Sequence, residues 1–334
     1  MSARIRLAAL AGIAASAVFL WLALRNADLT EIGAVLADAN YLWLVWIMPC
    51  LVIFYWLKLI RWQLILSHRV SAPAGSLVAP MMIGFAVNNL LPARIGELVR
   101  IYFAGKQLRL PQSFVFGTIL VERLLDLFAI LVLLIVGLAV SENTSETLAQ
   151  TGYALTTLAV VSFLLLGWAT SKPAAFQSFI AVLLRVFPDR IAKRLLDLAM
   201  QLLNGLTILR QPRTLALSLA NSTIQWLFMA ACIEISFRSV GLALPPGASL
   251  LCMALVVVSI MLPTAPGFFG AIELAFVVAL KPFGVPPETA FSAAILYHLT
   301  NYFLVTTTGV ALLRRQGLSL KSVQKDVRRD ADMA

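Results

Sequence analysis

The chain has 334 residues, of which 60% are hydrophobic and only 13% are charged, and its formal net charge is +10. This composition excludes a soluble globular protein and predicts an integral membrane protein without an independent soluble domain. The basic excess is typical of cytoplasmic loops, so no nucleic-acid partner is expected. The three cysteines lie in apolar runs and the two histidines are far apart, so we expect neither a disulfide framework nor a metal site.

Apolar runs long enough to cross about 30 Å of hydrocarbon predict the membrane spans. Six qualify, at about 5–24, 41–60, 114–140, 151–170, 214–236 and 289–313. The first follows Arg4 and Arg6 but has no clear cleavage site, which favours an uncleaved helix over a signal peptide.

Two further apolar segments, 77–91 and 248–262, are too short for a full crossing, because about fifteen helical residues reach only about 22 Å. Each ends at a proline and is followed by a second short helix, at about 95–104 and about 267–281. The prolines that mark the breaks are Pro92, Pro263 and Pro266.

The distribution of positive charge distinguishes two kinked spans from two re-entrant hairpins. With hairpins and a cytoplasmic N-terminus, most basic residues lie inside, whereas full spans would put the basic cluster at 172–213 outside. Full spans would also put the acidic loop with Glu142 and Glu146 inside. We therefore expect hairpins that enter from opposite faces, with both termini in the cytoplasm.

The expected fold class is an all-α polytopic membrane protein with six full spans, two oppositely inserted hairpins and an inverted repeat. Repeat one covers about 41–140 and repeat two about 214–313, within a single transmembrane domain at 1–315. An amphipathic linker helix at about 188–209 is expected to lie on the inner leaflet, and residues 316–334 form a basic cytoplasmic tail.

Backbone that leaves a helix inside the membrane must be paired by protein or water, so the breaks are expected to line a cavity. The second helix of each hairpin begins there and points its positive end inward. Gly267 and Gly270 permit close approach of a ligand, and Arg94 adds a full positive charge. These features suit a phosphate group.

Carboxylates follow both breaks. Glu97 either neutralises the dipole of its helix or takes part in function, and the sequence favours neither role. Glu273 has only apolar sequence neighbours and is a functional candidate. Glu122 and Asp126 share a helical face with Arg123 beside them. They either form an ion-pair network with Arg94 or Arg100, which pins hairpin to helix, or contact a substrate.

Four uncharged polar side chains are further candidates for the cavity wall. They are Asn88, Asn89, Asn301 and Tyr302. The segment "KLIRW" at 58–62 is interpreted instead as an anchor of snorkelling and interfacial side chains.

Five motifs follow one another along the chain: "RW" at 61–62, "NNLLPARIGELVR" at 88–100, "ERLLD" at 122–126, "LPTAPGFFGAIE" at 262–273 and "AILYHLTNY" at 294–302. In this order they resemble the lysylphosphatidylglycerol synthase transmembrane region, the flippase-like domain of bacterial multiple peptide resistance factors. The resemblance covers roughly 10–315. The cavity residues it implies are Arg94, Glu97, Arg100, Glu122, Arg123, Asp126, Pro263, Gly267, Gly270 and Glu273. Where such relatives often carry arginine, this chain has His298, which leaves the headgroup open.

The resemblance implies movement of a lipid between leaflets, and we expect a flippase-like translocase of a phosphate-headgroup lipid in the bacterial cytoplasmic membrane. We expect no enzyme activity, no synthase domain, no ATPase motif and no cofactor. The alternative is a membrane-embedded enzyme or accessory protein acting on a polyprenyl phosphate or other lipid carrier, with Asp28, Glu31 and Asp38 as exposed acidic candidates. Membrane lipids are the expected partners; a homo-oligomer or a lipid-synthesis enzyme partner stays open.

Overall fold

The computed structural model describes residues 3–67, 69–91, 94–140, 157, 160–161, 164–165, 167–188, 191–193, 195–196, 200, 211–262 and 264–317. Within these residues the regular structure is entirely helical. Several expectations lie wholly or mostly outside the described residues: the breaks at Pro92 and Pro263, the span at 151–170, the linker helix at 188–209 and the tail at 316–334.

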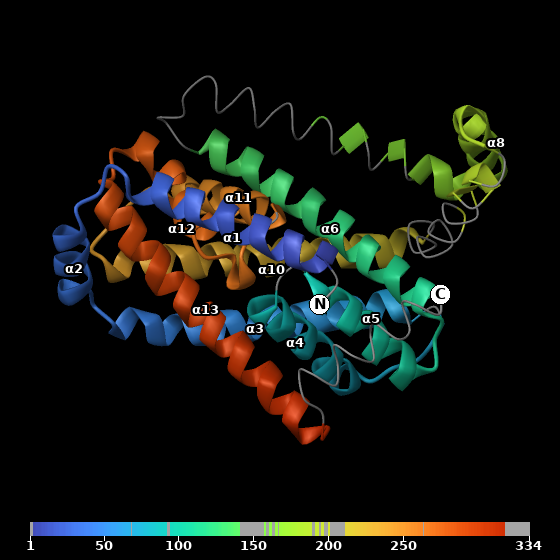
Figure 1. Cartoon of the computed structure of the whole chain (residues 1–334), viewed down its shortest axis with the longest axis horizontal. Coiled ribbons are helices and arrows are strands. Elements are labelled where there is room, and N and C mark those ends of the chain that lie inside the picture. Colours follow the sequence, from blue (N-terminus) through green and yellow to red (C-terminus); the bar gives the residue numbers. More distant parts are fainter. Residues whose placement is uncertain are drawn as a thin grey trace.

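The N-terminal part comprises α1 (Ala3–Leu24), α2 (Leu29–Asp38), α3 (Leu42–Leu66), α4 (Ala74–Leu90), α5 (Ile95–Leu108) and α6 (Gln112–Ala139). Next come α8 (Pro173–Leu183) and the 3-10 turn η1 (Leu184–Val186). The C-terminal part comprises α10 (Pro212–Ser239), α11 (Pro246–Met261), η3 (Pro266–Phe268), α12 (Ala271–Leu280), η4 (Lys281–Phe283) and α13 (Pro287–Arg315). Helices α3 and α10 run along the long horizontal axis of the molecule, with α2 at its left end (Figure 1).

Three described stretches are long and apolar enough to cross a membrane: Leu42–Leu66, Pro212–Ser239 and Pro266–Phe283. The pair Leu10–Leu24 and Leu29–Asp38, bent by 81°, counts as a fourth if it is one span. Continuous helices also occupy the spans expected at 114–140 and 289–313, as α6 and α13. The described chain is therefore an all-helical, multi-pass membrane protein.

Helices α4 and α5 fold back on each other and form the first hairpin. The backbone carbonyl of Ser76, early in α4, accepts a hydrogen bond from Gln107 near the end of α5, so the two helices are antiparallel. Between these ends the backbones touch, because a Cβ on Gly96 would overlap the carbonyl oxygen of Gly84. Helix α12 packs against α11, and we refer to these two helices as the second hairpin.

The two parts of the chain interlock through these hairpins. Helix α4 packs against α13 at Gly309, where a Cβ would overlap Met82 and Ala86. Helix α11 packs against α6 at Gly137, where a Cβ would lie 3.0 Å from the Cβ of Leu250. Each hairpin is therefore covered by the last long helix of the other part.

The largest apolar core joins α3, α6 and α10–α13. Small residues allow close approach there, among them Ala248 and Cys252 on α11 and Ala293 and Ala294 on α13, all fully buried. Close packing of small residues is the main attraction between helices in lipid, where burial from water gives no advantage. Cys50, Cys232 and Cys252 are free thiols on helices α3, α10 and α11.

Candidate functional site

A partly open cavity of about 270 Å³ lies among α3, α4, α6 and α10–α13. Most of its wall is aliphatic or aromatic, including Phe54, Phe85, Trp226 and Phe268. The polar groups on the wall are Tyr55, Lys58, Asn88, Asn89, Arg94, Glu97, Arg123, Asp126, Tyr297, His298, Asn301 and Tyr302.

Described residues that follow the two breaks, Arg94 and Phe268, lie together on the wall of this cavity. Arg94 is the residue before α5, and its guanidinium carbon lies 5.8 Å from the ring centroid of Phe268 in η3. Arg94, Gly267 and Phe268 have φ values of 52°, 75° and 63°, in the left-handed region that non-glycine residues rarely adopt. Left-handed residues thus follow both breaks, and they line the same cavity.

The two asparagines at the end of α4 have structural partners. The side-chain oxygen of Asn88 accepts a hydrogen bond from the backbone N–H of Gly96 at 2.8 Å, which satisfies an otherwise free amide in the first turn of α5. Asn89 donates to the hydroxyl of Thr306 on α13 at 3.0 Å. Both line the cavity, and both hold its wall together.

Asn301 and Tyr302 line the cavity from α13. The side-chain oxygen of Asn301 accepts a hydrogen bond from the Tyr55 hydroxyl at 2.9 Å, which joins α13 to α3. Tyr302 packs against Phe269, with 5.5 Å between ring centroids. A Cβ on Gly267 would lie 2.8 Å from the Tyr302 ring, so this glycine provides room for the aromatic wall.

Glu97 pairs with Arg123, with 2.8 Å between its Oε1 and the arginine Nη2. The side chains are 31% and 39% exposed, so this ion pair lies on the open part of the cavity wall. Glu97 also lies in the first turn of α5, where a carboxylate is stabilised by the helix dipole. The pair connects the first hairpin to α6.

Glu273 occupies the corresponding place on α12 but is buried. Its Oε2 accepts a hydrogen bond from the backbone N–H of Gly270 at 2.6 Å, and its Oε1 lies 2.6 Å from Nδ1 of His298 on α13. The other ring nitrogen of His298 lies 2.7 Å from the carbonyl oxygen of Gly267. That carbonyl can only accept, so Nε2 carries a proton and a second proton lies between Nδ1 and the carboxyl group.

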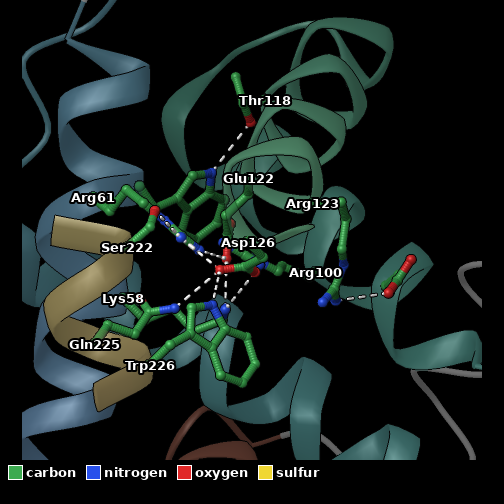
Figure 2. A network of polar contacts seen from close by, with 12 residues as sticks. Lys58, Arg61, Arg100, Thr118, Glu122, Arg123, Asp126, Ser222, Gln225 and Trp226 are labelled. Atoms are coloured by element: carbon green, nitrogen blue, oxygen red, sulfur yellow. Dashed lines mark hydrogen bonds and ion pairs between the residues drawn. The ribbon is translucent and has the colours of Figure 1, made fainter. Parts of the chain in front are cut away.

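A buried polar network surrounds Asp126 (Figure 2). One carboxylate oxygen accepts from Arg61 at 2.6 Å, Trp226 at 2.8 Å and Gln225 at 3.0 Å. The other accepts from Lys58 at 3.1 Å. These contacts join α3, α6 and α10, and a carboxylate with four donors is positioned to hold helices together.

Glu122 lies beside this cluster and is paired with Arg100 of the first hairpin at 2.6 Å. Lys58 and Arg61 each lie 3.3 Å from its other oxygen. The Arg100 guanidinium is stacked 3.7 Å from the ring centroid of Trp62. The sequence left open whether Arg94 or Arg100 pairs with the carboxylates of α6. Arg100 forms this pair, and it links the first hairpin to α6.

The interpretation of "KLIRW" as an interfacial anchor is wrong. Lys58, Arg61 and Trp62 are 4%, 0% and 0% exposed, because Glu122 and Asp126 face them from α6. The sequence does hold a signal for this contact. Lys58 and Arg61 are three residues apart and so lie on one helical face, and two carboxylates inside a span require buried cations.

Several predicted residues lie behind the cavity wall. They are Arg100, Glu122, Gly270 and Glu273, none of which is among the described lining residues. Gly270 packs against α1, since a Cβ there would lie 2.5 Å from the carbonyl oxygen of Ser16. Conversely, Tyr55, Lys58 and Trp226 line the cavity without having been predicted to do so.

Comparison with known proteins agrees with the sequence motifs. The family model described as "Lysylphosphatidylglycerol synthase TM region" matches residues 9–309. A UPF0104 membrane protein of Methanothermobacter thermautotrophicus is 25% identical, over 80% of this chain and 83% of that protein. A UPF0104 membrane protein of Methanocaldococcus jannaschii is 23% identical, over 76% and 79%.

Glycosyltransferase AglD of Haloferax volcanii is 26% identical, over 96% of this chain but only 56% of that protein. No solved structure matches. The family match includes both hairpins and every described residue of the cavity wall. The chain therefore belongs to the lysylphosphatidylglycerol synthase transmembrane region family.

Proposed function

We propose that the chain is a lipid translocase that moves a phospholipid or related phosphate-headgroup lipid between the leaflets of a bacterial cytoplasmic membrane. The observation that carries this proposal is the meeting of two hairpin breaks, at Arg94 and Phe268, on one cavity. Secondary transporters bind substrates where broken helices from two repeats meet near the bilayer midplane.

In the proposed topology, six helices cross the membrane and the two hairpins enter from opposite faces, with both chain termini in the cytoplasm. The lengths of α4 (17 residues) and α11 (16 residues) support the two hairpins, because helices of that length reach only about 25 Å and do not cross the hydrocarbon. Helix α5 lies toward the right of the molecule, and α11 and α12 lie toward the left (Figure 1). The reciprocal packing of each hairpin on the other part of the chain also supports an inverted repeat.

The phosphate would enter the polar side of the cavity near Arg94, while the acyl chains stay against the apolar wall and the bilayer. Movement is downhill or coupled to protons. Asp126 is a poor proton carrier, because its oxygens already accept four hydrogen bonds. Glu273 and His298 are the better candidates, because they hold a shared proton at the second break.

Reconstituted vesicles test this proposal. Dithionite bleaches only the outer-leaflet lipid unless the protein moves labelled lipid outward. Wild-type protein should accelerate bleaching of lipids with a chain-attached fluorophore, and Arg94→Gln should slow it. Arg238→Gln, in the half-exposed pair with Glu234, is the control and should behave as wild type. No acceleration for any phosphate-headgroup lipid would overturn the proposal.

A second candidate function is favoured by the similarity to glycosyltransferase AglD. In that case the chain would act on a lipid carrier such as a polyprenyl phosphate, as an enzyme or as the membrane partner of one. Asp28 is then the exposed acid to test. Its carboxylate accepts a hydrogen bond from the backbone N–H of Thr30 at 2.7 Å, which lowers its pKa and caps α2. Sugar transfer to a polyprenyl phosphate that is lost in Asp28→Ala would favour this function.

A further inference from the structure

The charges around the cavity identify the class of lipid that fits it. The charged groups on the described wall are Lys58, Arg94, Arg123, Glu97 and Asp126, together with His298. Behind them lie Arg61, Arg100 and Glu122, within the same network. Apart from Glu273 and His298, five cations therefore share three carboxylates in this part of the structure.

The pairing shows which cations have no carboxylate of their own. Glu97 pairs with Arg123 at 2.8 Å, Glu122 with Arg100 at 2.6 Å and Asp126 with Arg61 at 2.6 Å. Each carboxylate thus has an arginine as its nearest charged partner.

Lys58 is the first surplus cation. Its Nζ lies 3.1 Å from Asp126 and 3.3 Å from Glu122, but both carboxylates are already matched by an arginine at shorter distance. Lys58 reaches the cavity wall. It therefore adds positive charge to the cavity.

Arg94 is the second surplus cation. Among the described residues it forms no ion pair within 4 Å: it lies 5.8 Å from the ring centroid of Phe268, and the carboxylate that acts on it, Glu97, is already paired with Arg123. Its side chain is partly buried at the point where the two breaks meet. A cation in this position, beside an apolar wall, is stabilised by an anion that enters the cavity.

Glu273 and His298 do not offset this excess. The 2.6 Å contact between them needs one proton, so the pair is either a carboxylate with an imidazolium or a carboxylic acid with a neutral imidazole. Both forms have no net charge.

We propose that the cavity takes lipids whose phosphate headgroup is net negative, such as phosphatidylglycerol, and excludes aminoacylated lipids whose headgroup is net positive. This inference rests on the proposed function. A lysyl ester brings two ammonium groups to a cavity whose surrounding cations Lys58, Arg61, Arg94, Arg100 and Arg123 already outnumber the carboxylates Glu97, Glu122 and Asp126. Like charges brought together in this way select strongly against the wrong partner.

Translocation rates for lipids of different charge test the proposal. Vesicles would carry chain-labelled phosphatidylglycerol, phosphatidylethanolamine or lysylphosphatidylglycerol in the same host bilayer. Wild-type protein should move phosphatidylglycerol at least about tenfold faster than the lysyl lipid, with the zwitterionic lipid between them. Arg94→Glu should abolish or reverse this order. Arg185→Glu, at an exposed arginine outside the cavity wall, is the matched charge reversal and should preserve it.

Binding provides a readout that does not depend on movement. Native mass spectrometry of the protein in mixed micelles should find phosphatidylglycerol retained over the lysyl lipid, and Arg94→Glu should remove the preference. Soluble glycerol phosphate should not displace the lipid, because most of the wall is apolar. Its retention in place of lipid would overturn the lipid assignment and identify a free phosphate site.

A stability comparison tests whether Lys58 is surplus. Lys58→Met leaves every carboxylate with an arginine but removes the described donor to one oxygen of Asp126, so it should lower the melting temperature, and by less than Arg61→Met does. Lys58→Met should also weaken the preference for phosphatidylglycerol.

The outcomes separate the two proposals. Equal rates and equal retention of the three lipids would overturn the charge selectivity and keep translocation. A preference in binding without movement of any lipid would keep the selectivity and overturn translocation. Faster movement or stronger retention of the lysyl lipid would overturn the inference.

Discussion

Arg94 lies over the ring of Phe268, although the two residues come from hairpins far apart in the sequence. Both have left-handed backbone conformations, which are unfavourable for side chains with a Cβ and persist where surrounding packing holds them. Contacts at both breaks provide that packing. Asn88 binds the start of α5, and Ser16 on α1 accepts a hydrogen bond from Ala265 at 2.8 Å.

Crosslinking should join the two breaks directly. In a background without native cysteines, Arg94→Cys together with Phe268→Cys should be bridged by a bifunctional thiol reagent long enough to replace the arginine side chain, because the ends of the native side chains lie 5.8 Å apart. Protease digestion and mass spectrometry would detect the linked peptides. The two single-cysteine variants are the controls, and absence of a linked peptide in the double variant would contradict the arrangement of the breaks.

Asp126→Asn should destabilise the fold strongly. The change leaves Lys58 and Arg61 buried without the carboxylate that both of them contact. Breaking a buried ion pair in this way lowers the free energy of unfolding by about 3–5 kcal/mol. Unfolding in mixed micelles with increasing denaturing detergent would measure the loss. Glu234→Gln is the control, because its half-exposed pair with Arg238 should contribute less than about 1 kcal/mol. Equal effects of the two changes would show that the Asp126 network does not hold the helices together.

Glu273→Gln should preserve the fold, whereas Glu273→Ala should not. A glutamine can accept from Gly270 and donate to a neutral His298, so its cost should stay within about 1 kcal/mol. Alanine leaves both groups buried without partners and should cost about 2–3 kcal/mol. Thermal unfolding would compare the two variants.

The same glutamine variant tests proton coupling. It removes the proton shared by Glu273 and His298 while keeping their hydrogen bonds. If this pair couples translocation to protons, the wild-type rate changes with pH and the rate of Glu273→Gln does not. Parallel pH profiles for the two proteins would assign Glu273 a structural role only.

Gly96→Ala should destabilise the first hairpin. Its Cβ would overlap the backbone of Gly84 and lie 2.6 Å from Asn88 Oδ1, and such overpacking should cost at least about 2 kcal/mol. Gly33→Ala on α2 is the matched control. A Cβ there meets nothing within 4 Å, so better helix propensity should stabilise the protein by about 0.5–1 kcal/mol. Similar unfolding midpoints for the two variants would contradict the backbone contact between α4 and α5.

The broken helices could be predicted because proline and span length act locally. Pro92 and Pro263 interrupt apolar runs that are too short to cross, and the helices that end before them and begin after them lie close to the expected bounds. Family motifs then indicated which polar residues belong together. Arg94, Glu97 and Arg123 do line one cavity.

The partners of each charge could not be predicted in the same way. Lys58 near the end of a span can extend to the interface or turn inward, and the choice depends on which helix packs against it. Helix α6 faces α3 with Glu122 and Asp126, a relationship that depends on tertiary packing rather than on either segment alone. The contacts of His298 likewise depend on tertiary packing, because its two partners, Glu273 and the carbonyl of Gly267, come from another part of the chain.

Gly137 and Gly309 make the two parts of the chain depend on each other. Since α4 is covered by α13 and α11 by α6, neither part has a complete interior by itself. Either part made alone would leave bare the helix face that the other part covers. The contacts that complete the interior are therefore also the contacts by which two separately made halves would recognise each other.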